Sequence, residues 1–326
     1  MSASVGSTRL SSIQRYLSNA NLENDFSLSN SIPALAIVLI VAGIAFRMGT
    51  IPINFQSRIH LKAMPYWLTT LFALISVCVG SAILILFVNK VAVIEFGFME
   101  QILFYIALII LASTAGLLLL EKELKVTLIL IIMQITGVFF AQLSVACWKW
   151  RHDFLGREWV SIQDMMNEFS PMIAFSFLAV LGLACLLDSL SSQQSAIIYQ
   201  DQLQGLIVDQ RLLGSAAVIL LATLMGFPGL PAFRLKWQTL ISLFEIHQEQ
   251  STGAMATIHV GYLGLAVLIL VSSTIVAFVC AKLMIQICFA RPLGRNRLIT
   301  QKRMAFFCYC CVIGSLIFNL RMIANL

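Results

Sequence analysis

The sequence predicts an all-α fold: a polytopic membrane bundle of about eight transmembrane helices, two of them broken. Of the 326 residues, 60% are hydrophobic and only 11% are charged, whereas a soluble domain carries about a quarter charged residues. The apolar residues also come in blocks of about 20, the length that a helix needs to cross the hydrocarbon of a bilayer. Alternation of apolar and polar residues, which marks membrane β-strands, is absent from the sequence.

The predicted elements follow a polar tail. Residues 1–30 are rich in Ser and Asn, and no small-residue cleavage site follows an apolar run there, so a removed signal peptide is not expected. The remaining residues, 31–326, form the predicted transmembrane domain. Its apolar runs, each predicting one crossing, fall at about 32–55, 66–89, 101–120, 124–147, 169–190, 211–246, 258–289 and 304–325.

Two polar segments interrupt these runs. Residues 148–168 mix Trp with charged residues, as expected for a segment at the level of the lipid headgroups. Residues 191–210 are rich in Gln and predict a short amphipathic helix at the surface. Both segments are therefore expected to lie at the edge of the membrane.

Lys and Arg are divided unevenly between the two sides of the predicted bundle. The loops on the side of the N-terminus carry six of these residues, and the loops on the other side carry ten. The richer side is the cytoplasmic one under the positive-inside rule, so both termini are expected on the outer side. Because the cations are spread over loops rather than gathered in one stripe, the net charge of +6 gives no reason to expect nucleic-acid binding.

The sequence offers no metal site, bound cofactor or soluble-type catalytic motif. Its eight Cys residues lie almost all inside apolar runs, where a thiol acts as a small hydrophobe. Cys308 and Cys311 have the spacing of a metal half-site, but no second pair or His cluster completes a tetrahedral set. Phosphate-binding loops, nucleophile elbows and dinucleotide fingerprints are missing.

Two cations fall inside or near predicted crossings. The apolar run before Arg47 has only about 13 residues, so the first span is expected to continue past it and to hold Arg47 near membrane depth. A cation near a helix centre costs roughly 2.5–3.5 kcal/mol, so Arg47 either marks an ion pathway or snorkels to the interface. Lys282 interrupts another long run and is open to the same pathway role or to a role as a cytoplasmic anchor.

The run 211–246 is longer than one crossing and predicts a broken helix. Pro228 and Pro231 remove backbone donors there, and Gly226 loosens the helix. Broken membrane helices are tolerated only where the freed backbone groups meet protein or water. We therefore expect the break to line a polar cavity with Lys236 just after it, unless Lys236 snorkels to an interface.

Two groups of short motifs resemble those of a known family. The first group is Gly43-Ile-Ala-Phe46-Arg47, Ile51-Pro52 and Ala63-Met64-Pro65. The second is Leu203-Gln-Gly205-Leu206, Leu224-Met-Gly226-Phe-Pro228 and Phe233-x-x-Lys236-Trp237. They resemble the G-x-x-F-K, V-P-F-H and G-A-P motifs, and the G-L, L-A-G-I-P and F-x-x-K-F motifs, of the antiporter-like membrane subunits of respiratory complex I. The resemblance is closest to the NADH-quinone oxidoreductase subunit N type of the proton-conducting membrane transporter family.

The resemblance implies four proton-pathway positions. Lys236 and Arg47 fall on the lysine positions of the family's two broken helices, the latter followed by Pro52. Lys125 falls where the family has the Lys of a K-R pair, and Lys282 where it often has an Arg. Arg cannot readily lose a proton, so Arg47 is expected to modulate the pathway electrostatically rather than to carry protons.

The sequence also departs from the family at two relay positions. The gapless alignment places Ser76 and Val77 where the family has a relay Lys, and Ile135 where it has a His. Family members have about fourteen helices, of which residues 31–326 match the last eight. The first of the two inverted half-channel repeats is therefore expected to be incomplete.

The family resemblance implies a membrane subunit of an NADH:quinone oxidoreductase that takes part in proton translocation coupled to electron transfer. It would bind no cofactor itself, since NADH, flavin, iron–sulfur clusters and quinone belong to partner subunits. Its partners would be other membrane subunits of a complex I-like assembly in a bacterial inner membrane. Two alternatives stay open: a non-pumping structural subunit, which the apolar Val77 and Ile135 favour, and a cation/proton antiporter subunit.

Overall fold

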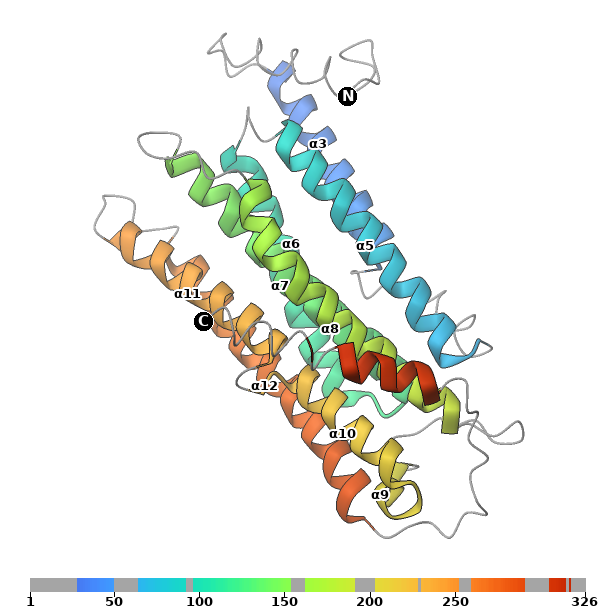
Figure 1. Cartoon of the computed structure of the whole chain (residues 1–326). Coiled ribbons are helices and arrows are strands. Elements are labelled where there is room, and N and C mark those ends of the chain that lie inside the picture. Colours follow the sequence, from blue (N-terminus) through green and yellow to red (C-terminus); the bar gives the residue numbers. More distant parts are fainter. Residues whose placement is uncertain are drawn as a thin grey trace.

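Long helices in one bundle account for the architecture in a computed structural model of the chain (Figure 1). The structure describes residues 28–49, 64–91, 96–153, 162–190, 203–227, 230–251, 259–290, 305–314 and 317. No strand occurs within these ranges. The elements are α3 (Leu28–Arg47), α5 (Tyr66–Val91), α6 (Phe96–Leu120), α7 (Leu124–Asp153), α8 (Ile162–Leu190), α9 (Leu206–Asp209), α10 (Arg211–Met225), α11 (Pro231–Ser251) and α12 (His259–Phe289), followed by a short helix, Ala305–Gly314.

Each predicted apolar run contains helix among its described residues, and the predicted polytopic helical bundle is confirmed. By length and hydropathy, five helices of the described chain could cross a membrane: Tyr66–Asn89, Met99–Leu120, Leu124–Lys149, Pro171–Leu190 and Gly261–Phe289. The apolar parts of the other predicted spans are shorter in the described residues, at Leu35–Arg47, Arg211–Met225 and Ala305–Gly314. The run 211–246 contributes two helices, α10 and α11, rather than one.

Helix α7 lies at the centre of the bundle (Figure 1). Of its most apolar stretch, 89% is buried inside the protein, compared with 33% for α5 and 39% for α12. It packs most extensively on α6, where Gly137 permits close approach, because a Cβ added at Gly137 would lie only 2.9 Å from Leu111 Cδ2. Small residues allow membrane helices to approach in this way.

Most hydroxyl groups inside the helices are satisfied by their own backbone. Thr70 Oγ1 donates to Tyr66 O at 2.8 Å, and Thr239 Oγ1 donates to Leu235 O at the same distance. Such bonds to a carbonyl one turn earlier let a helix bury Ser and Thr in an apolar environment. The buried polar groups that lack this solution are therefore the ones that point to a site.

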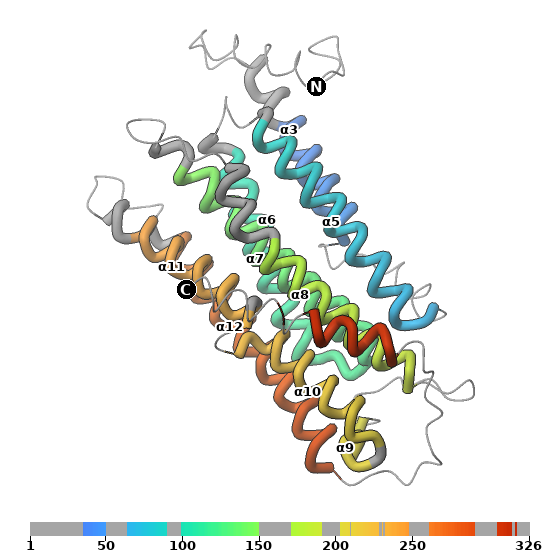
Figure 2. The backbone as a smooth tube through the Cα atoms, in the orientation of Figure 1, coloured from blue at the N-terminus to red at the C-terminus, as the bar shows by residue number. Residues whose placement is uncertain are grey.

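The predicted interruption lies between α10 and α11. Helix α10 ends at Met225, and Gly226 adopts a left-handed conformation with φ of 81°. Its N–H and that of Phe227 turn back to the carbonyls of Thr223 and Ala222, both at 3.3 Å. Helix α11 then begins at Pro231, and the two helices together lead from one end of the bundle to the other (Figure 2). The predicted break residues Pro228 and Pro52 lie outside the described residues.

Candidate functional site

Lys236 lies in the second turn of α11, facing the interior of the bundle. Only 9% of the residue is exposed, and its Nζ has no hydrogen-bond partner among the described residues. A Cβ placed on Gly226 would lie 3.6 Å from this nitrogen, so the side chain reaches back to the interruption between α10 and α11. Lys236 therefore lies next to the break between α10 and α11, as predicted.

The end of α10 is a favourable place for a cation. The last four carbonyls of a helix lack partners within it, and the helix dipole places partial negative charge at that end. The sequence folds this way because Gly226 accepts the left-handed conformation that ends α10, which a residue with a Cβ adopts only at a cost. The break thus places the C-terminal end of α10 beside the buried Lys236, whose Nζ has no hydrogen-bond partner among the described residues.

The chemistry open to Lys236 follows from its burial. Holding an ammonium in a low-dielectric interior without a charged partner costs several kcal/mol, which water or loss of the proton relieves. Lysine can lose its proton in such surroundings, whereas arginine stays charged. Cys280 on α12 lies within electrostatic reach of Lys236. The site is therefore suited to binding and releasing a proton.

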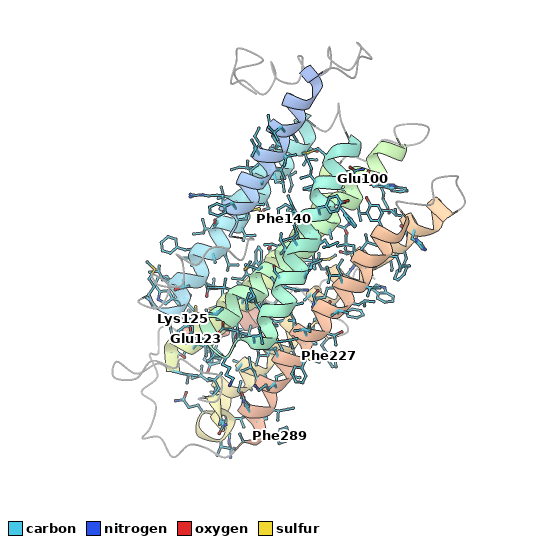
Figure 3. The ribbon with its side chains drawn as sticks, turned by 180° about the vertical axis from the view of Figure 1, so that it is seen from behind. Glu100, Glu123, Lys125, Phe140, Phe227 and Phe289 are labelled. Atoms are coloured by element: carbon cyan, nitrogen blue, oxygen red, sulfur yellow. The ribbon has the colours of Figure 1, made fainter. Side chains whose placement is uncertain are left out.

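Lys125, at the start of α7, belongs to a second polar cluster. This cluster lies toward the end of the bundle opposite to Glu100 of α6 (Figure 3). Lys125 Nζ donates to Met64 O at 2.5 Å and lies 4.8 Å from the centroid of the Tyr66 ring. Asp188, which is 7% exposed at the end of α8, accepts hydrogen bonds from the backbone N–H groups of Tyr66 at 2.9 Å and Trp67 at 2.6 Å. This carboxylate therefore caps the start of α5 and faces the lysine.

The other two predicted pathway cations are exposed on this chain. Arg47 is the last residue of α3, and its backbone carbonyl accepts a hydrogen bond from Ser76 Oγ at 2.5 Å. Lys282 faces outward from α12. The structure thus does not bring either side chain to Lys236. Whether any of the four cations takes part in proton transfer stays a prediction.

The two apolar residues that the alignment places at the family's relay positions lie inside the bundle. Val77 on α5 is 4% exposed, and Ile135 on α7 is 5% exposed. Both side chains join the apolar core of the bundle. Neither side chain has a group that can bind or release a proton.

Several buried amide and imidazole atoms lie on α7 and α11. Within the described chain, no hydrogen-bond partner is found for Gln134 Nε2, for either polar atom of the Gln142 amide, for Gln238 Oε1 or for His247 Nδ1. Buried polar groups in proteins are nearly always hydrogen bonded to protein or ordered water. A buried water molecule could therefore supply the hydrogen bonds that these atoms lack.

Sequence reasoning missed one buried acid. Glu100 in α6 is 5% exposed, and the hydroxyl of Tyr262 in α12 donates a hydrogen bond to its Oε1. Their separation of 162 residues leaves no local pattern that links them. The one available signal is the acid itself, which directly precedes an apolar run and so resembles an ordinary helix end.

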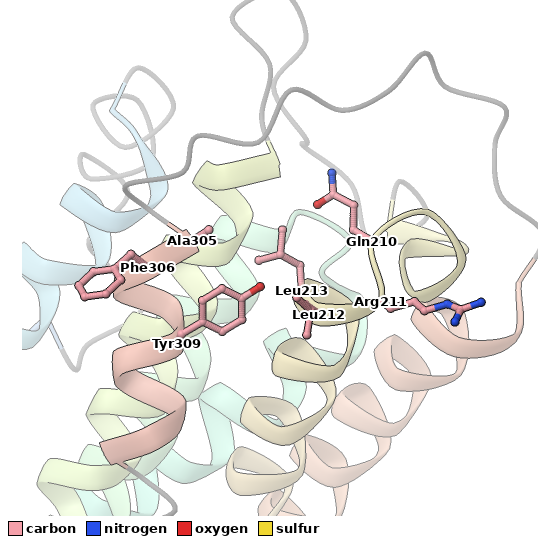
Figure 4. Close-up of a pocket in the computed structure, with 7 residues that line it drawn as sticks. All are labelled: Gln210, Arg211, Leu212, Leu213, Ala305, Phe306 and Tyr309. Carbon is pink, nitrogen blue, oxygen red and sulfur yellow. The ribbon is translucent and has the colours of Figure 1, made fainter.

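A groove on the described surface lies between the start of α10 and the short helix Ala305–Gly314 (Figure 4). It has a volume of about 600 Å³ and is lined by Gln210, Arg211, Leu212, Leu213, Ala305, Phe306 and Tyr309. The Arg211 side chain extends away from it. Among the described residues, no three His, Cys, Asp or Glu side chains lie together as metal ligands would.

The fold and site thus define a polytopic helical membrane protein with a buried lysine at the break of a divided helix. No family model and no curated protein matches the sequence. Among solved structures, a chain of respiratory complex I from Thermus thermophilus, in a structure with bound aureothin, is similar with a TM-score of 0.59 and 18% sequence identity. The match covers 95% of this chain and 65% of that one, so this chain spans about two thirds of its length. The similarity shows a shared fold.

Proposed function

We propose that this chain is a membrane subunit of a complex I-type NADH:quinone oxidoreductase and takes part in proton translocation. The observation that carries the proposal is Lys236: a buried lysine, without a hydrogen-bond partner among the described residues, at the break between α10 and α11. Ionisable residues inside membrane proteins are costly and usually belong to ion or proton routes. The shared fold with a complex I chain supports the choice of assembly.

In this proposal Lys236 is the central proton carrier. Its ammonium releases a proton when the surrounding charge makes the neutral amine more favourable, and the amine binds a proton again when that charge is removed. The low dielectric of the interior makes each charged site strongly sensitive to its neighbours. Charge therefore moves in steps between sites rather than as a free proton.

The cluster around Lys125 and Asp188 would connect the route to the cytoplasmic side, with both chain termini on the outer side. Lys125 lies at the start of α7, and the carboxylate of Asp188 faces it across the start of α5. A proton reaching Lys125 changes the charge beside this carboxylate. NADH, flavin, iron–sulfur clusters and quinone would belong to partner subunits. Electron transfer would therefore act on this chain only through its contacts with those subunits.

One observation favours a second function, that of a non-pumping structural subunit in the same kind of assembly. Val77 and Ile135, at the positions of the family's relay residues, are apolar and buried. In that case Lys236 would be a remnant inside a scaffold. The two proposals differ in what the removal of Lys236 does to proton translocation.

The assembly is tested by purifying the tagged chain in mild detergent from its own cells, followed by mass spectrometry and NADH:quinone activity of the material. The proposal expects complex I subunits and activity to co-purify. The pumping role is then tested with Lys236→Ala, with the exposed Lys282→Ala as the control. A solitary protein contradicts the assembly, and unchanged pumping in an assembled Lys236→Ala complex supports the structural subunit instead.

A further inference from the structure

Glu100 occupies a pocket built by three helices near the end of the bundle opposite Lys125 (Figure 3). Its Oε1 accepts a hydrogen bond from the Tyr262 hydroxyl of α12, and its backbone carbonyl accepts one from Ser144 Oγ of α7 at 3.2 Å. The fully buried Cys147 of α7 lies within electrostatic reach. Tyr262 of α12 thus holds the carboxyl, and Ser144 of α7 holds the backbone of α6 beside it.

The seam between α6 and α12 closes around this pocket. The Phe104 ring, one turn along α6 from Glu100, packs edge-on against the Tyr262 ring with centroids 5.3 Å apart. The neighbouring Gly261 leaves room for it, because an added Cβ would lie 3.3 Å from Phe104 Cζ. The aromatic rings therefore cover the pocket on one side and fix the Tyr262 hydroxyl toward the carboxyl.

The salt bridge between α7 and α11 relates the position of Glu100 along the bundle to that of Lys236. The two helices run in the same direction (Figure 1), and Lys149 Nζ of α7 lies 2.9 Å from Glu245 Oε2 of α11. Lys236 precedes Glu245 by nine residues, and Ser144 precedes Lys149 by five. At 1.5 Å per residue, Ser144, and the Glu100 backbone bonded to it, therefore lie roughly 6 Å farther along the bundle than the backbone of Lys236, whose side chain reaches back toward Gly226.

The interval between these two levels contains buried polar groups. Gln142 on α7 and Gln238 on α11 fall within it. Both Gln142 amide atoms and Gln238 Oε1 are without a hydrogen-bond partner in the described part of the chain. A water needs two to four polar partners to be held inside a protein, and such amides supply them. Polar groups able to hold water therefore lie at levels of the bundle between Lys236 and Glu100.

We propose that Glu100, positioned by Tyr262, is the proton-exchange site that connects Lys236 to the outer side of the bundle. This inference rests on the proposed function. An N–H bond of the Lys236 ammonium breaks, a proton passes through bridging water, and an O–H bond forms on the Glu100 carboxylate. The two charges are thereby both neutralised. Release of that proton to the outer side restores the carboxylate, and a proton from the opposite side restores the ammonium.

Proton exchange is distinguished from a purely structural hydrogen bond by replacing Glu100 with glutamine in the assembled complex. Glu100→Gln keeps an oxygen that accepts from Tyr262 but cannot bind and release a proton. We expect the rate of proton translocation to fall about a hundredfold, the lower end of what a positioned proton-transfer group contributes. The matched control is Glu245→Gln, which removes an exposed acid at the same end and should leave the rate unchanged.

Infrared difference spectra between low and high pH report the carboxyl directly. The protonated-carboxyl band of Glu100 should disappear in Glu100→Gln and shift in Tyr262→Phe, which removes only the donated hydrogen bond. A wild-type translocation rate in Glu100→Gln, or no change in the carboxyl bands, overturns the assignment of Glu100.

The outcome also separates this inference from the function on which it rests. If Lys236→Ala stops translocation while Glu100→Gln does not, the pumping role stands and the route to the outer side lies elsewhere. If neither variant lowers translocation in an assembled complex, the pumping role itself is wrong.

Discussion

Removing the carboxylate of Asp188 should destabilise the bundle through the start of α5. The side chain is 7% exposed and accepts two backbone hydrogen bonds, from Tyr66 N–H at 2.9 Å and from Trp67 N–H at 2.6 Å. These donors belong to the first turn of α5, where no intrahelical carbonyl can accept them. Asp188 therefore ties the end of α8 to the beginning of α5, which lies 121 residues earlier.

The expected magnitude follows from these two bonds. Hydrogen bonds to charged groups contribute about 1.5–3 kcal/mol each, so the loss of both in Asp188→Ala should lower the free energy of unfolding by about 3–6 kcal/mol. Asp188→Asn keeps one carbonyl acceptor and loses the other together with the charge, so about half of that loss is expected. The two variants should therefore rank in the order wild type, Asn, Ala.

The assay is unfolding of the detergent-solubilised chain by titration with a denaturing detergent, followed by Trp fluorescence. The control is Ser81→Ala on α5, because Ser81 Oγ bonds only within its own helix, to Cys78 O at 2.9 Å. Its stability should match that of the wild type. A loss below about 0.5 kcal/mol for Asp188→Ala, less than even one neutral hydrogen bond supplies, would refute the capping role.

Three further changes test other contacts in the same assay. Gly226→Ala should cost about 1–2 kcal/mol, because φ is 81° and a side chain is strained there; an unchanged stability would show that α10 does not end in this conformation. Gly214→Ala should cost about 1–3 kcal/mol, since its Cβ would lie 2.7 Å from Ile207 Cα and the backbone of α9 must shift. Lys149→Met removes a partly exposed ion pair with Glu245 and should cost less than about 1 kcal/mol; a larger loss would mean that this pair is not the solvated bridge it resembles.

The helices and the main interruption could be predicted from the sequence because their causes are local. A run of about 20 apolar residues is sufficient to specify a crossing. The stretch from Gly226 to Pro231 breaks the helix through its own backbone preferences. Lys236 follows within two turns, so its proximity to the break is also a local property.

The faces of the helices could not be predicted in the same way. Helix α12 is apolar nearly all round, so its pattern does not define which side meets the bundle. Lys282 is exposed there, whereas Cys280, two residues earlier, is buried. Only packing against the neighbouring helices decides between these positions.

The pairing of Glu100 with Tyr262 is the clearest case of a site that local patterns leave out. An acid just before an apolar run is normally a solvated helix end, and a Tyr near a helix start is normally an interface residue. Their contact exists because α6 and α12 pack closely beside Gly261. That approach depends on tertiary structure alone.

The most direct test of the account is the number of protons translocated per electron by membrane vesicles that carry the assembled complex with Lys236→Met. Methionine keeps a long side chain and removes the titratable nitrogen, while Lys282→Met, at an exposed position, serves as the matched control. The account predicts a lower proton-to-electron ratio for Lys236→Met and a wild-type ratio for the control. A wild-type ratio for Lys236→Met, with assembly and electron transfer intact, would contradict the claim that Lys236 carries protons.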